Sequence, residues 1–461
     1  MLTGEPMPVT KAKGDVVTGG TINTDGTLIC LATHTGNDSK LAQIIKLVET
    51  AQSARLPIQG LVDQITLRFV PAVLLIAALA MLVWGVIGPE PKLPFMLVVG
   101  VSVLIIACPC AMGLATPTSI MIGTGRAAEL GVLFRTGNAL QHLQGATLVA
   151  FDKTGTLTEG RPNLIGLIPT KGTTREAALA LVAAVEAPSQ HPLARAIVDA
   201  TQGMELAVAS DTTAVSGRGV SGVVDGKLIH VGKHAWLTEM GADLTSFDTA
   251  RDAAEAKGET VFFAMQNAEP LAMLTISDTV KAGAKQAIQM LKDRGVRVAL
   301  ISGDSAAAVA HFAEQLGLET TVADVLPEGK IAALDSLREG GDVIAFVGDG
   351  INDAPALAHA DIGIAVGTGT DVAMDAADVV LMGGDPAGVA VAVTVSRKTM
   401  QNIRQNLVWA FGYNVALIPV AAGLLYPFFG VLLSPALAAG AMGLSSLFVL
   451  SNALRLRKMK A

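Results

Sequence analysis

The stretch LVAFDKTGT, Leu148 to Thr156, decides how the central part of this chain is expected to fold. Four apolar residues lead directly into Asp152, and a glycine follows three positions later. Similar apolar runs lead into Asp304 and into Asp349. Short apolar runs that are separated by helical patterns are typical of parallel strands buried on both faces. We therefore expect an α/β domain in which these aspartates meet at the carboxyl ends of the strands.

Two other parts of the soluble sequence have a different pattern. From about Glu159 to Met273, apolar and polar positions alternate in VSGVVDGKLIHVG and TVFFAMQNAEPLAML, which indicates antiparallel strands. We expect this interval to be an α+β domain inserted into the α/β domain. The first 50 residues also alternate, with glycines at the turns, as a small antiparallel β unit would.

The composition predicts that the rest of the chain lies in a membrane. Of the 461 residues 51% are hydrophobic and 16% are charged, and the net charge is −7, so we expect no nucleic-acid partner. Charge-free windows cover Phe69–Gly88, Leu93–Gly125 and Gln405–Leu454. A span needs about 20 apolar residues, so the last window holds two spans that turn near Tyr426 and Pro427.

Basic residues flank one end of each predicted span, which predicts that these ends face the cytoplasm of a multi-pass protein. They are Arg68, Arg126, Arg135, Arg404, Arg455, Arg457, Lys458 and Lys460. The expected domains are a β unit at 1–50, a helix pair at 51–126, an α/β domain at 127–158 and 274–390, the inserted domain at 159–273, and a second helix pair with a tail at 391–461.

The motifs DKTGTLTEG and GDGINDAPAL, in this order, resemble those of the P-type ATPases. A CPC motif inside a span resembles their copper-transporting heavy-metal branch, and the resemblance covers essentially the whole chain. It implies a haloacid-dehalogenase-like phosphorylation domain, an inserted nucleotide-binding domain, part of a β actuator domain and a helical transmembrane bundle. It also implies ATP-driven export of Cu(I) or Ag(I), with Mg²⁺ as cofactor, across a bacterial inner membrane.

The resemblance assigns the phosphorylation chemistry to residues around Asp152, which would receive the phosphoryl group from ATP. A carboxylate can act in this way when Mg²⁺, a hard cation that prefers oxygen ligands, neutralises the developing charge. The family more often has threonine where Ser302 stands, which keeps the hydroxyl group. The implied magnesium ligands are Asp152, Asp349 and Asp353, and the implied catalytic residues besides Asp152 are Thr154, Lys330, Asp304 and Glu5.

Two simpler interpretations of these aspartates stay open. An aspartate at the end of a strand can cap the following helix. A soluble phosphatase of the same fold also uses an aspartate nucleophile, usually with a second aspartate two residues later as general acid. Here Thr154 occupies that second position, so a phosphoenzyme is expected to persist.

The inserted domain carries residues that resemble the nucleotide site of the heavy-metal pumps. Glu186 and His191 lie in VEAPSQHPLARAI, and Gly217 and Gly219 lie in SGRGVSG. Glycines let a backbone approach a nucleotide closely. The His-Pro pair alone would also suit the start of a helix. The family often has an asparagine after a glycine where this chain has Lys233, so that contact is in doubt.

The sequence IIACPCAMGLATP predicts a metal site within a span. Proline removes a backbone donor and opens the helix, which is expected to turn Cys108 and Cys110 toward the bundle interior. Two soft thiolates suit Cu(I) or Ag(I), although cysteine can also pack as a small hydrophobe. Three cysteines in the chain are too few for a disulfide framework. The copper branch implies four further ligands, which are Tyr413, Asn414, Met442 and Ser446.

The absence of charge in the last spans separates copper from other metals. By resemblance, a zinc, cadmium or lead pump would place a lysine and an aspartate there, and a calcium pump several acidic ligands. None occurs between Gln405 and Leu454. Methionine as core filler and serine as helix-packing residue remain the simpler interpretations of single positions.

The tripeptide Thr3-Gly4-Glu5 resembles the actuator loop, in which the glutamate positions water to hydrolyse the phosphoaspartate, although such a tripeptide suits any turn. Because it follows Met1 almost directly, we expect the chain to be N-terminally truncated relative to the family, which has four earlier spans. Two alternatives to copper export remain. One is a pump that loads copper into an extracytoplasmic oxidase, and the other is a non-transporting remnant that binds ATP or metal. A cytosolic copper chaperone is an implied partner.

Overall fold

The computed structural model describes residues 12, 14–15, 17, 27–32, 57–189, 192–215, 218–349, 353–367 and 375–460. The described residues form two compact units. One unit contains the long helices and takes in residues up to 146, 377–383 and 388–461. The other contains two β-sheets and takes in 147–376 and 384–387. The predicted actuator loop at Thr3–Glu5 lies outside the described residues.

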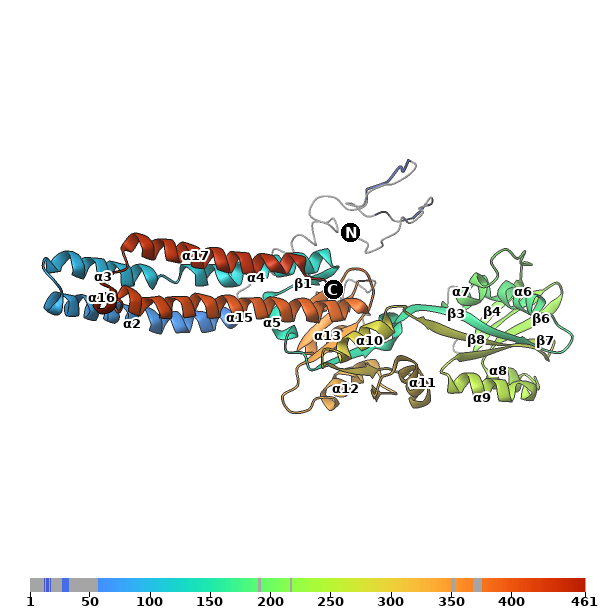
Figure 1. Cartoon of the computed structure of the whole chain (residues 1–461). Coiled ribbons are helices and arrows are strands. Elements are labelled where there is room, and N and C mark those ends of the chain that lie inside the picture. Colours follow the sequence, from blue (N-terminus) through green and yellow to red (C-terminus); the bar gives the residue numbers. More distant parts are fainter. Residues whose placement is uncertain are drawn as a thin grey trace. The chain divides into compact units, whose positions relative to one another are not determined.

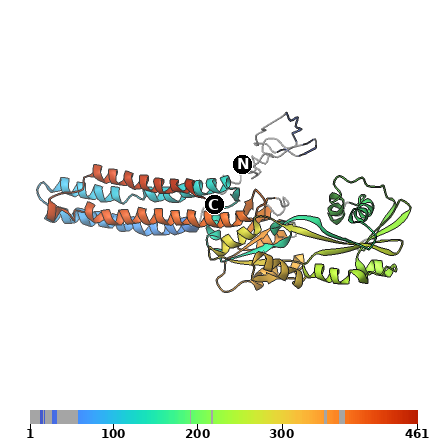
Figure 2. The ribbon, with the colours of Figure 1, turned by 45° about the vertical axis from the view of Figure 1, so that its right-hand side comes forward.

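The helical unit consists of long helices that run alongside one another (Figures 1 and 2). They are α2 (Pro57–Ile87), α3 (Lys92–Ile106), α4 (Cys110–Glu129), α15 (Ala387–Ala421) and α17 (Pro435–Leu454). The short α16 (Tyr426–Phe429) lies in the turn between α15 and α17, where a turn is predicted. A 3-10 turn (Arg455–Lys458) follows α17.

Three helical stretches in the described residues are long and apolar enough to cross a membrane, namely Pro57–Ile87, Lys92–Glu129 and Pro435–Lys458. The predicted fourth span falls in α15, which is not among them. Charged residues occupy the first half of α15 and amides interrupt its second half, so its apolar character is weaker. That fourth span stays a prediction.

Small and branched apolar side chains pack these helices together. The buried cluster includes Val73, Val103, Ile106, Ile418 and Ala438, and so joins α2, α3, α15 and α17. Near one end the Trp84 indole N–H donates to the Ala422 carbonyl at 2.9 Å. The same unit also holds α5 (Gly137–Leu143) and an antiparallel pair of strands, β1 (Val132–Phe134) and β13 (Val379–Leu381).

The second unit contains the predicted parallel sheet. Its strands, in the order β12-β11-β2-β9-β10, are all parallel to their neighbours. They are β2 (Leu148–Asp152), β9 (Arg297–Ile301), β10 (Thr320–Val322), β11 (Ile344–Gly348) and β12 (Ile362–Val366). Every residue of β2, β11 and β12 is buried, which explains why these strands have continuous apolar sequences. The α/β prediction is confirmed.

Helices and turns connect these strands. They are α10 (Ala284–Lys292), α11 (Ala306–Leu316), α12 (Lys330–Ser336) and α13 (Ala354–His359), a turn η2 (Lys153–Leu157) after β2, and a 3-10 turn η4 (Pro327–Gly329) before α12. Helix α11 begins at Ser305, whose hydroxyl accepts the Ala308 N–H, and ends at Gly317 in the left-handed conformation.

The inserted segment forms a six-stranded antiparallel sheet, as its alternating sequence predicts, in the order β3-β8-β7-β6-β5-β4. The strands are β3 (Thr158–Pro169), β4 (Ser210–Val215), β5 (Gly219–Val224), β6 (Lys227–Gly232), β7 (Thr260–Gln266) and β8 (Glu269–Val280). The helical elements are α6 (Arg175–Glu186), α7 (Pro192–Asp199), α8 (His234–Glu239), η3 (Thr245–Phe247) and α9 (Asp248–Ala256).

Alternation along the central strands supplies a core for each face of this sheet. Ala264 in β7 and Leu274 in β8 pack with residues of α6 and α7. Their neighbours Phe263 and Met273 pack instead with Trp236 of α8 and with Phe247. The sheet is therefore covered by helices on both faces, because successive side chains of a strand point to opposite sides.

Phe346 tests how strongly the parallel sheet depends on its buried side chains. It is fully buried in β11, so Phe346→Ala is expected to lower the free energy of unfolding by about 3 kcal/mol or more. Thermal unfolding measures this change, with limited proteolysis at each temperature used to detect the unfolded fraction. Leu326→Ala is the control, because Leu326 is 70% exposed. If it lowers the free energy of unfolding as much as Phe346→Ala does, the stability of the sheet does not depend on the buried Phe346 ring.

Candidate active site and candidate metal site

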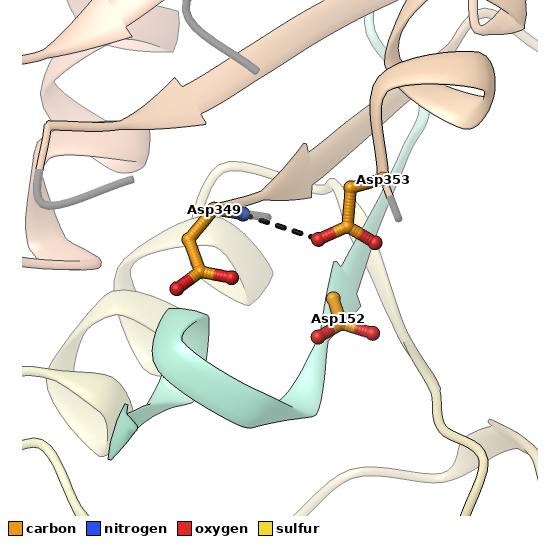
Figure 3. Close-up of side chains that lie close together, drawn as sticks. All are labelled: Asp152, Asp349 and Asp353. Atoms are coloured by element: carbon orange, nitrogen blue, oxygen red, sulfur yellow. Dashed lines mark hydrogen bonds between the residues drawn. The ribbon is translucent and has the colours of Figure 1, made fainter. Parts of the chain in front are cut away.

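Three carboxylates meet at one edge of the parallel sheet (Figure 3). Strands β2 and β11 pair in a register that sets Phe151 opposite Val347, so Asp152 ends β2 beside the end of β11. Asp349 follows β11 directly, and Asp353 precedes α13. Carboxylate oxygens of these three residues lie within 4.8 Å of one another. The prediction that strand-end aspartates meet is confirmed for Asp152 and Asp349.

Lys330 joins two of these carboxylates. Its Nζ donates to Asp152 Oδ1 at 2.6 Å and also donates to Asp353 Oδ1. The backbone N–H of Asp349 donates to Asp353 Oδ2 at 3.2 Å. Lys330 is only 8% exposed and is the first residue of α12. The cluster is therefore buried and held by charged hydrogen bonds, which are stronger than neutral ones.

Burial and mutual repulsion shift the protonation of the cluster. Burial, and then the negative charge of Asp353, raises the pKa of Asp152 to about 7 even though Lys330 acts in the opposite direction. The same two causes raise the pKa of Asp349. Burial alone would lower the pKa of Lys330, but Asp152 and Asp353 together raise it. Carboxylates outnumber ammonium groups at this point, so a hard divalent cation such as Mg²⁺ fits the donor set.

The loop after Asp152 must pass very close to Asp349. Gly155 has φ of +74°, and a Cβ at this position would overlap the Asp349 carboxylate. Glycine is required here for both its conformation and its small size. Thr154 lies in the same loop and is exposed.

Lys281 is a site residue that the sequence analysis missed. Its buried Nζ donates to the Gly155 carbonyl at 2.6 Å and to the Gly384 carbonyl at 3.0 Å. Burial lowers the pKa of Lys281. A lysine directly after the long apolar strand β8 was the available signal, because an ammonium group is seldom buried without partners.

Among the described residues, Asp304 pairs with residues other than the three clustered aspartates. It forms an ion pair with Lys153, and its backbone N–H donates to Ser302 Oγ at 3.2 Å. Lys153 also lies 5.7 Å from the centroid of the Phe312 ring. The structure thus gives Asp304 the role of a partner for Lys153, and its predicted catalytic role stays a prediction.

The predicted nucleotide residues are only partly described. His191 and Gly217 lie outside the described residues. Glu186 ends α6, and burial raises its pKa to about 7. Gly219 lies in β5, where a Cβ would overlap the Val231 carbonyl and the Trp236 ring. Packing alone therefore explains the glycine at position 219, and the nucleotide roles stay predictions.

The CPC motif breaks its helix as predicted. Helix α3 ends at Ile106 and α4 begins at Cys110, with Pro109 between them. The structure joins Cys108 and Cys110 in a disulfide, which the small number of cysteines did not predict. In this form neither sulfur is a thiolate, so metal binding by these residues requires the reduced pair. Cys108 is half-buried and Cys110 is exposed among the described residues, and the expected direction of the two sulfurs toward the bundle interior stays a prediction.

Among the other predicted copper ligands, Asn414 has a hydrogen bond to the CPC motif in the described part of the chain. Its Nδ2 donates to the Cys108 carbonyl at 3.4 Å. The side chain is 2% exposed, and its Oδ1 has no hydrogen-bond partner among the described residues. Met442 is buried in α17, the Ser446 hydroxyl donates to the Met442 carbonyl at 3.3 Å, and Tyr413 is half-buried.

Glu186 makes the stability of the inserted sheet depend on pH. Its usual pKa of 4.5 rises to about 7 in the folded state, so the folded state holds the proton more tightly. The stabilisation is fully present below about pH 4.5 and is lost as the pH rises through about 7. Glu186→Gln stays neutral, so we expect the loss of stability between pH 5 and 7.5 to shrink by on the order of 2 kcal/mol.

Hydrogen exchange of the β7 and β8 amides in the full chain measures this difference. Glu176→Gln is the matched control, because Glu176 is exposed in the first turn of the same helix. An unchanged pH dependence in Glu186→Gln would show that the carboxyl group is not held protonated.

Comparisons with known proteins agree with this architecture. The haloacid dehalogenase-like hydrolase family matches residues 146–361, and the P-type ATPase actuator domain matches residues 1–49. A crystal structure of a zinc-transporting PIB-type ATPase is 36% identical and has a TM-score of 0.71. The match covers 99% of this chain and 73% of that chain.

Relatives with assigned names match along the whole sequence. Copper-transporting ATPase 1 of Rhizobium meliloti (strain 1021) is 54% identical over 461 residues, which is 100% of this chain and 56% of the relative. The silver exporting P-type ATPase of Salmonella typhimurium is 45% identical over 462 residues, with coverage of 100% and 56%. This chain spans little more than half the length of these curated relatives.

The matches to metal-transporting pumps extend over essentially the whole sequence. The chain belongs to the heavy-metal branch of the P-type ATPases.

Proposed function

We propose that this chain is part of a pump that exports Cu(I), or Ag(I), across a bacterial inner membrane and is driven by ATP through a phosphorylated Asp152. The observation that carries the proposal is the buried cluster of Asp152, Asp349 and Asp353 around Lys330. Such a cluster suits phosphoryl transfer, in which the protein positions the phosphate and offsets its charge.

The described side chains have distinct tasks in the proposed phosphorylation. The Asp152 carboxylate attacks the terminal phosphorus of ATP, and the bond from that phosphorus to the bridging oxygen of ADP breaks. Asp349 and Asp353 would hold Mg²⁺ together with Asp152, and the bound ion would neutralise phosphate charge. Lys330 already donates a hydrogen bond to Asp152. After transfer, its ammonium group would donate to the phosphoryl oxygens and offset their negative charge. Lys281 fixes the loop at Gly155, so that the nucleophile keeps its position.

The inserted sheet would bind the nucleotide that supplies the phosphate. Glu186, His191, Gly217 and Gly219 remain the proposed contacts. A Glu186 carboxyl group with a pKa of about 7 is protonated in part at neutral pH. In its neutral form it can donate a hydrogen bond to an adenine ring, which a carboxylate cannot.

The transported ion would bind near the break between α3 and α4. Reduced Cys108 and Cys110 offer soft sulfur ligands, and soft ligands select Cu(I) or Ag(I). The unpartnered Asn414 Oδ1 supports a site here, because a buried polar atom without a partner is costly unless a ligand occupies it. Met442, Tyr413 and Ser446 are proposed to complete the site.

Copper or silver is preferred to zinc because α17 and the part of α15 from Gln405 onward carry no charged side chain. Among the relatives, names include copper-transporting and silver exporting pumps, whereas two solved structures that match most of this chain are of a zinc-transporting ATPase. From Gln405 to Leu454 the chain has no charged side chain that could pair with a divalent ion. Loading an extracytoplasmic oxidase with copper is the alternative use of the same site, and a cytosolic copper chaperone is the proposed donor.

The remaining expectations complete the proposal. We assign 1–50 to the carboxyl-terminal part of an actuator domain, with Glu5 positioning water for hydrolysis of the phosphoaspartate. Residues 127–158 and 274–390 would be the phosphorylation domain, and 159–273 the nucleotide-binding domain. The helix pairs at 51–126 and 391–461 would span the membrane, with their basic ends in the cytoplasm.

The phosphorylation step predicts a covalent intermediate on Asp152. Chain incubated with labelled ATP and Mg²⁺ is expected to carry acid-stable phosphate that hydroxylamine releases, because an acyl phosphate reacts with that nucleophile. Asp152→Asn should abolish the label completely. Asp335→Asn is the control, because Asp335 is an exposed carboxylate paired with His359 rather than a member of the cluster.

Equal labelling of Asp152→Asn and the original chain would disprove the choice of nucleophile. ATP binding without any label would favour the remnant that binds nucleotide but does not pump.

The metal site predicts selective Cu(I) binding by the reduced chain. After reduction of the disulfide, Cys108→Ser is expected to weaken Cu(I) affinity by at least about tenfold, because one thiolate ligand is lost. Asn414→Ala should weaken it less. Competition with a coloured Cu(I) chelator measures both, and Cys30→Ser is the matched control, because Cys30 is an exposed cysteine outside the CPC motif.

Tighter binding of zinc than of Cu(I) by the reduced chain would overturn the choice of metal. An affinity that Cys30→Ser lowers as much as Cys108→Ser would overturn the choice of site.

A further inference from the structure

A recess between α15 and α17 has no task in the proposed transport. It encloses about 720 Å³ and is lined by side chains of both helices. The lining residues that matter here are Gln401, Arg404, Trp409, Phe448, Asn452 and Arg455. They combine two guanidinium groups, two amides and two aromatic rings, which indicates a ligand with both a charged and an apolar part.

The charges around the recess have a single sign. From Ala387 to Ala461 the sequence has seven lysines and arginines and no aspartate or glutamate. Among the described ion pairs, none includes Arg404 or Arg455. Arg455 Nη1 donates instead to Asn452 Oδ1 at 3.1 Å. The recess is therefore complementary to an anion that the described part of the chain does not supply.

The aromatic rings lie on the apolar side of the two arginines. Trp409 follows Arg404 by five residues in α15, and Phe448 precedes Arg455 by seven in the oppositely directed α17. At 1.5 Å per residue both rings lie about 8 to 10 Å farther into the apolar part of the helices. The two rings stack with centroids 5.5 Å apart, and each is more than half exposed. They offer a surface to an apolar chain below the charged group.

We propose that this recess binds one anionic phospholipid, with its phosphate between Arg404 and Arg455 and an acyl chain over Trp409 and Phe448. Basic recesses between membrane helices at the cytoplasmic side suit anionic headgroups, and aromatic rings favour the interface between headgroups and hydrocarbon. The amide of Gln401, which also lines the recess, can donate to a remaining headgroup oxygen. A lipid fits better than a free phosphate ion, because free phosphate would leave the exposed surfaces of both rings uncovered.

The bound lipid would also contact the place where three helices are tied together. Asn452 Nδ2 donates to Asn406 Oδ1 at 2.9 Å, and Asn406 Nδ2 donates to Ser119 Oγ at 3.2 Å. Ser119 belongs to α4, the helix that begins at Cys110. Arg455, which would hold the headgroup, donates to Asn452, and Asn452 belongs to this network of hydrogen bonds between α17, α15 and α4.

Native mass spectrometry of the full chain tests the proposal. Detergent-solubilised chain is mixed with equal amounts of phosphatidylglycerol and phosphatidylcholine, and the retained lipid is counted. The original chain is expected to retain one phosphatidylglycerol in preference to phosphatidylcholine. Arg404→Gln with Arg455→Gln should lower this retention by about tenfold or more, since two cationic contacts are lost. Both arginines are exposed, so the variant is expected to fold.

A matched pair of substitutions separates the recess from the general charge of the tail. Arg457→Gln with Lys460→Gln removes the same charge from the same end of the chain, and neither residue lines the recess. This control should change retention by less than twofold. An equal loss in both double variants would overturn the proposal, because retention would then depend on net charge alone.

Two further measurements separate a lipid from a free phosphate. Trp409→Ala keeps both arginines and should lower phosphatidylglycerol retention several-fold, whereas an unchanged retention would overturn the acyl-chain contact. Inorganic phosphate at equal concentration should not displace the lipid. Displacement by inorganic phosphate would identify the recess as a simple anion site and overturn the lipid assignment.

Discussion

The buried ammonium group of Lys330 between Asp152 and Asp353 is the contact on which the candidate active site depends. Three carboxylates whose oxygens lie within 4.8 Å of one another repel each other strongly when they are shielded from water. Lys330 offsets part of this repulsion, and burial leaves the pKa of Asp152 at about 7. The cluster is thus short of positive charge, which suits it to bind a divalent cation and a phosphate together. Gly155 and Lys281 support this arrangement, one by its lack of a side chain and the other by holding the loop.

The sequence predicted the main features of this site because they depend on local patterns. An apolar run that leads into an aspartate is a property of consecutive residues, and the parallel register then brings Asp152 and Asp349 to one edge. Lys281 was missed because its partners, the carbonyls of Gly155 and Gly384, are more than 100 residues away. The pairing of Asp304 with Lys153 was missed for the same reason. Contacts of this kind depend on the tertiary fold and leave no periodic signal.

The CPC motif shows the same division between local and tertiary information. The helix break at Pro109 follows from the missing backbone N–H of one residue, and it was predicted correctly. The direction of each sulfur depends on how α3 and α4 pack with other helices, which a pattern of consecutive residues does not give. The disulfide between Cys108 and Cys110 was also outside the prediction, because a count of cysteines does not give the distance between two sulfurs. A disulfide leaves neither sulfur as a thiolate, so the proposed metal binding by these two residues would require the reduced pair.

Several amides of α15 are paired with polar groups of neighbouring helices. Asn402 and Asn406 are satisfied by Ser119 and Asn452, so their polar atoms are hydrogen-bonded within the helices, as polar groups in hydrocarbon must be. Asn414 differs, because its Oδ1 is buried and has no partner in the described part of the chain, while its Nδ2 contacts the Cys108 carbonyl. The same residue type thus has two roles along one helix. Where amides pair with each other they hold helices together, whereas the unpartnered Asn414 Oδ1 beside the helix break supports the metal site that we propose there.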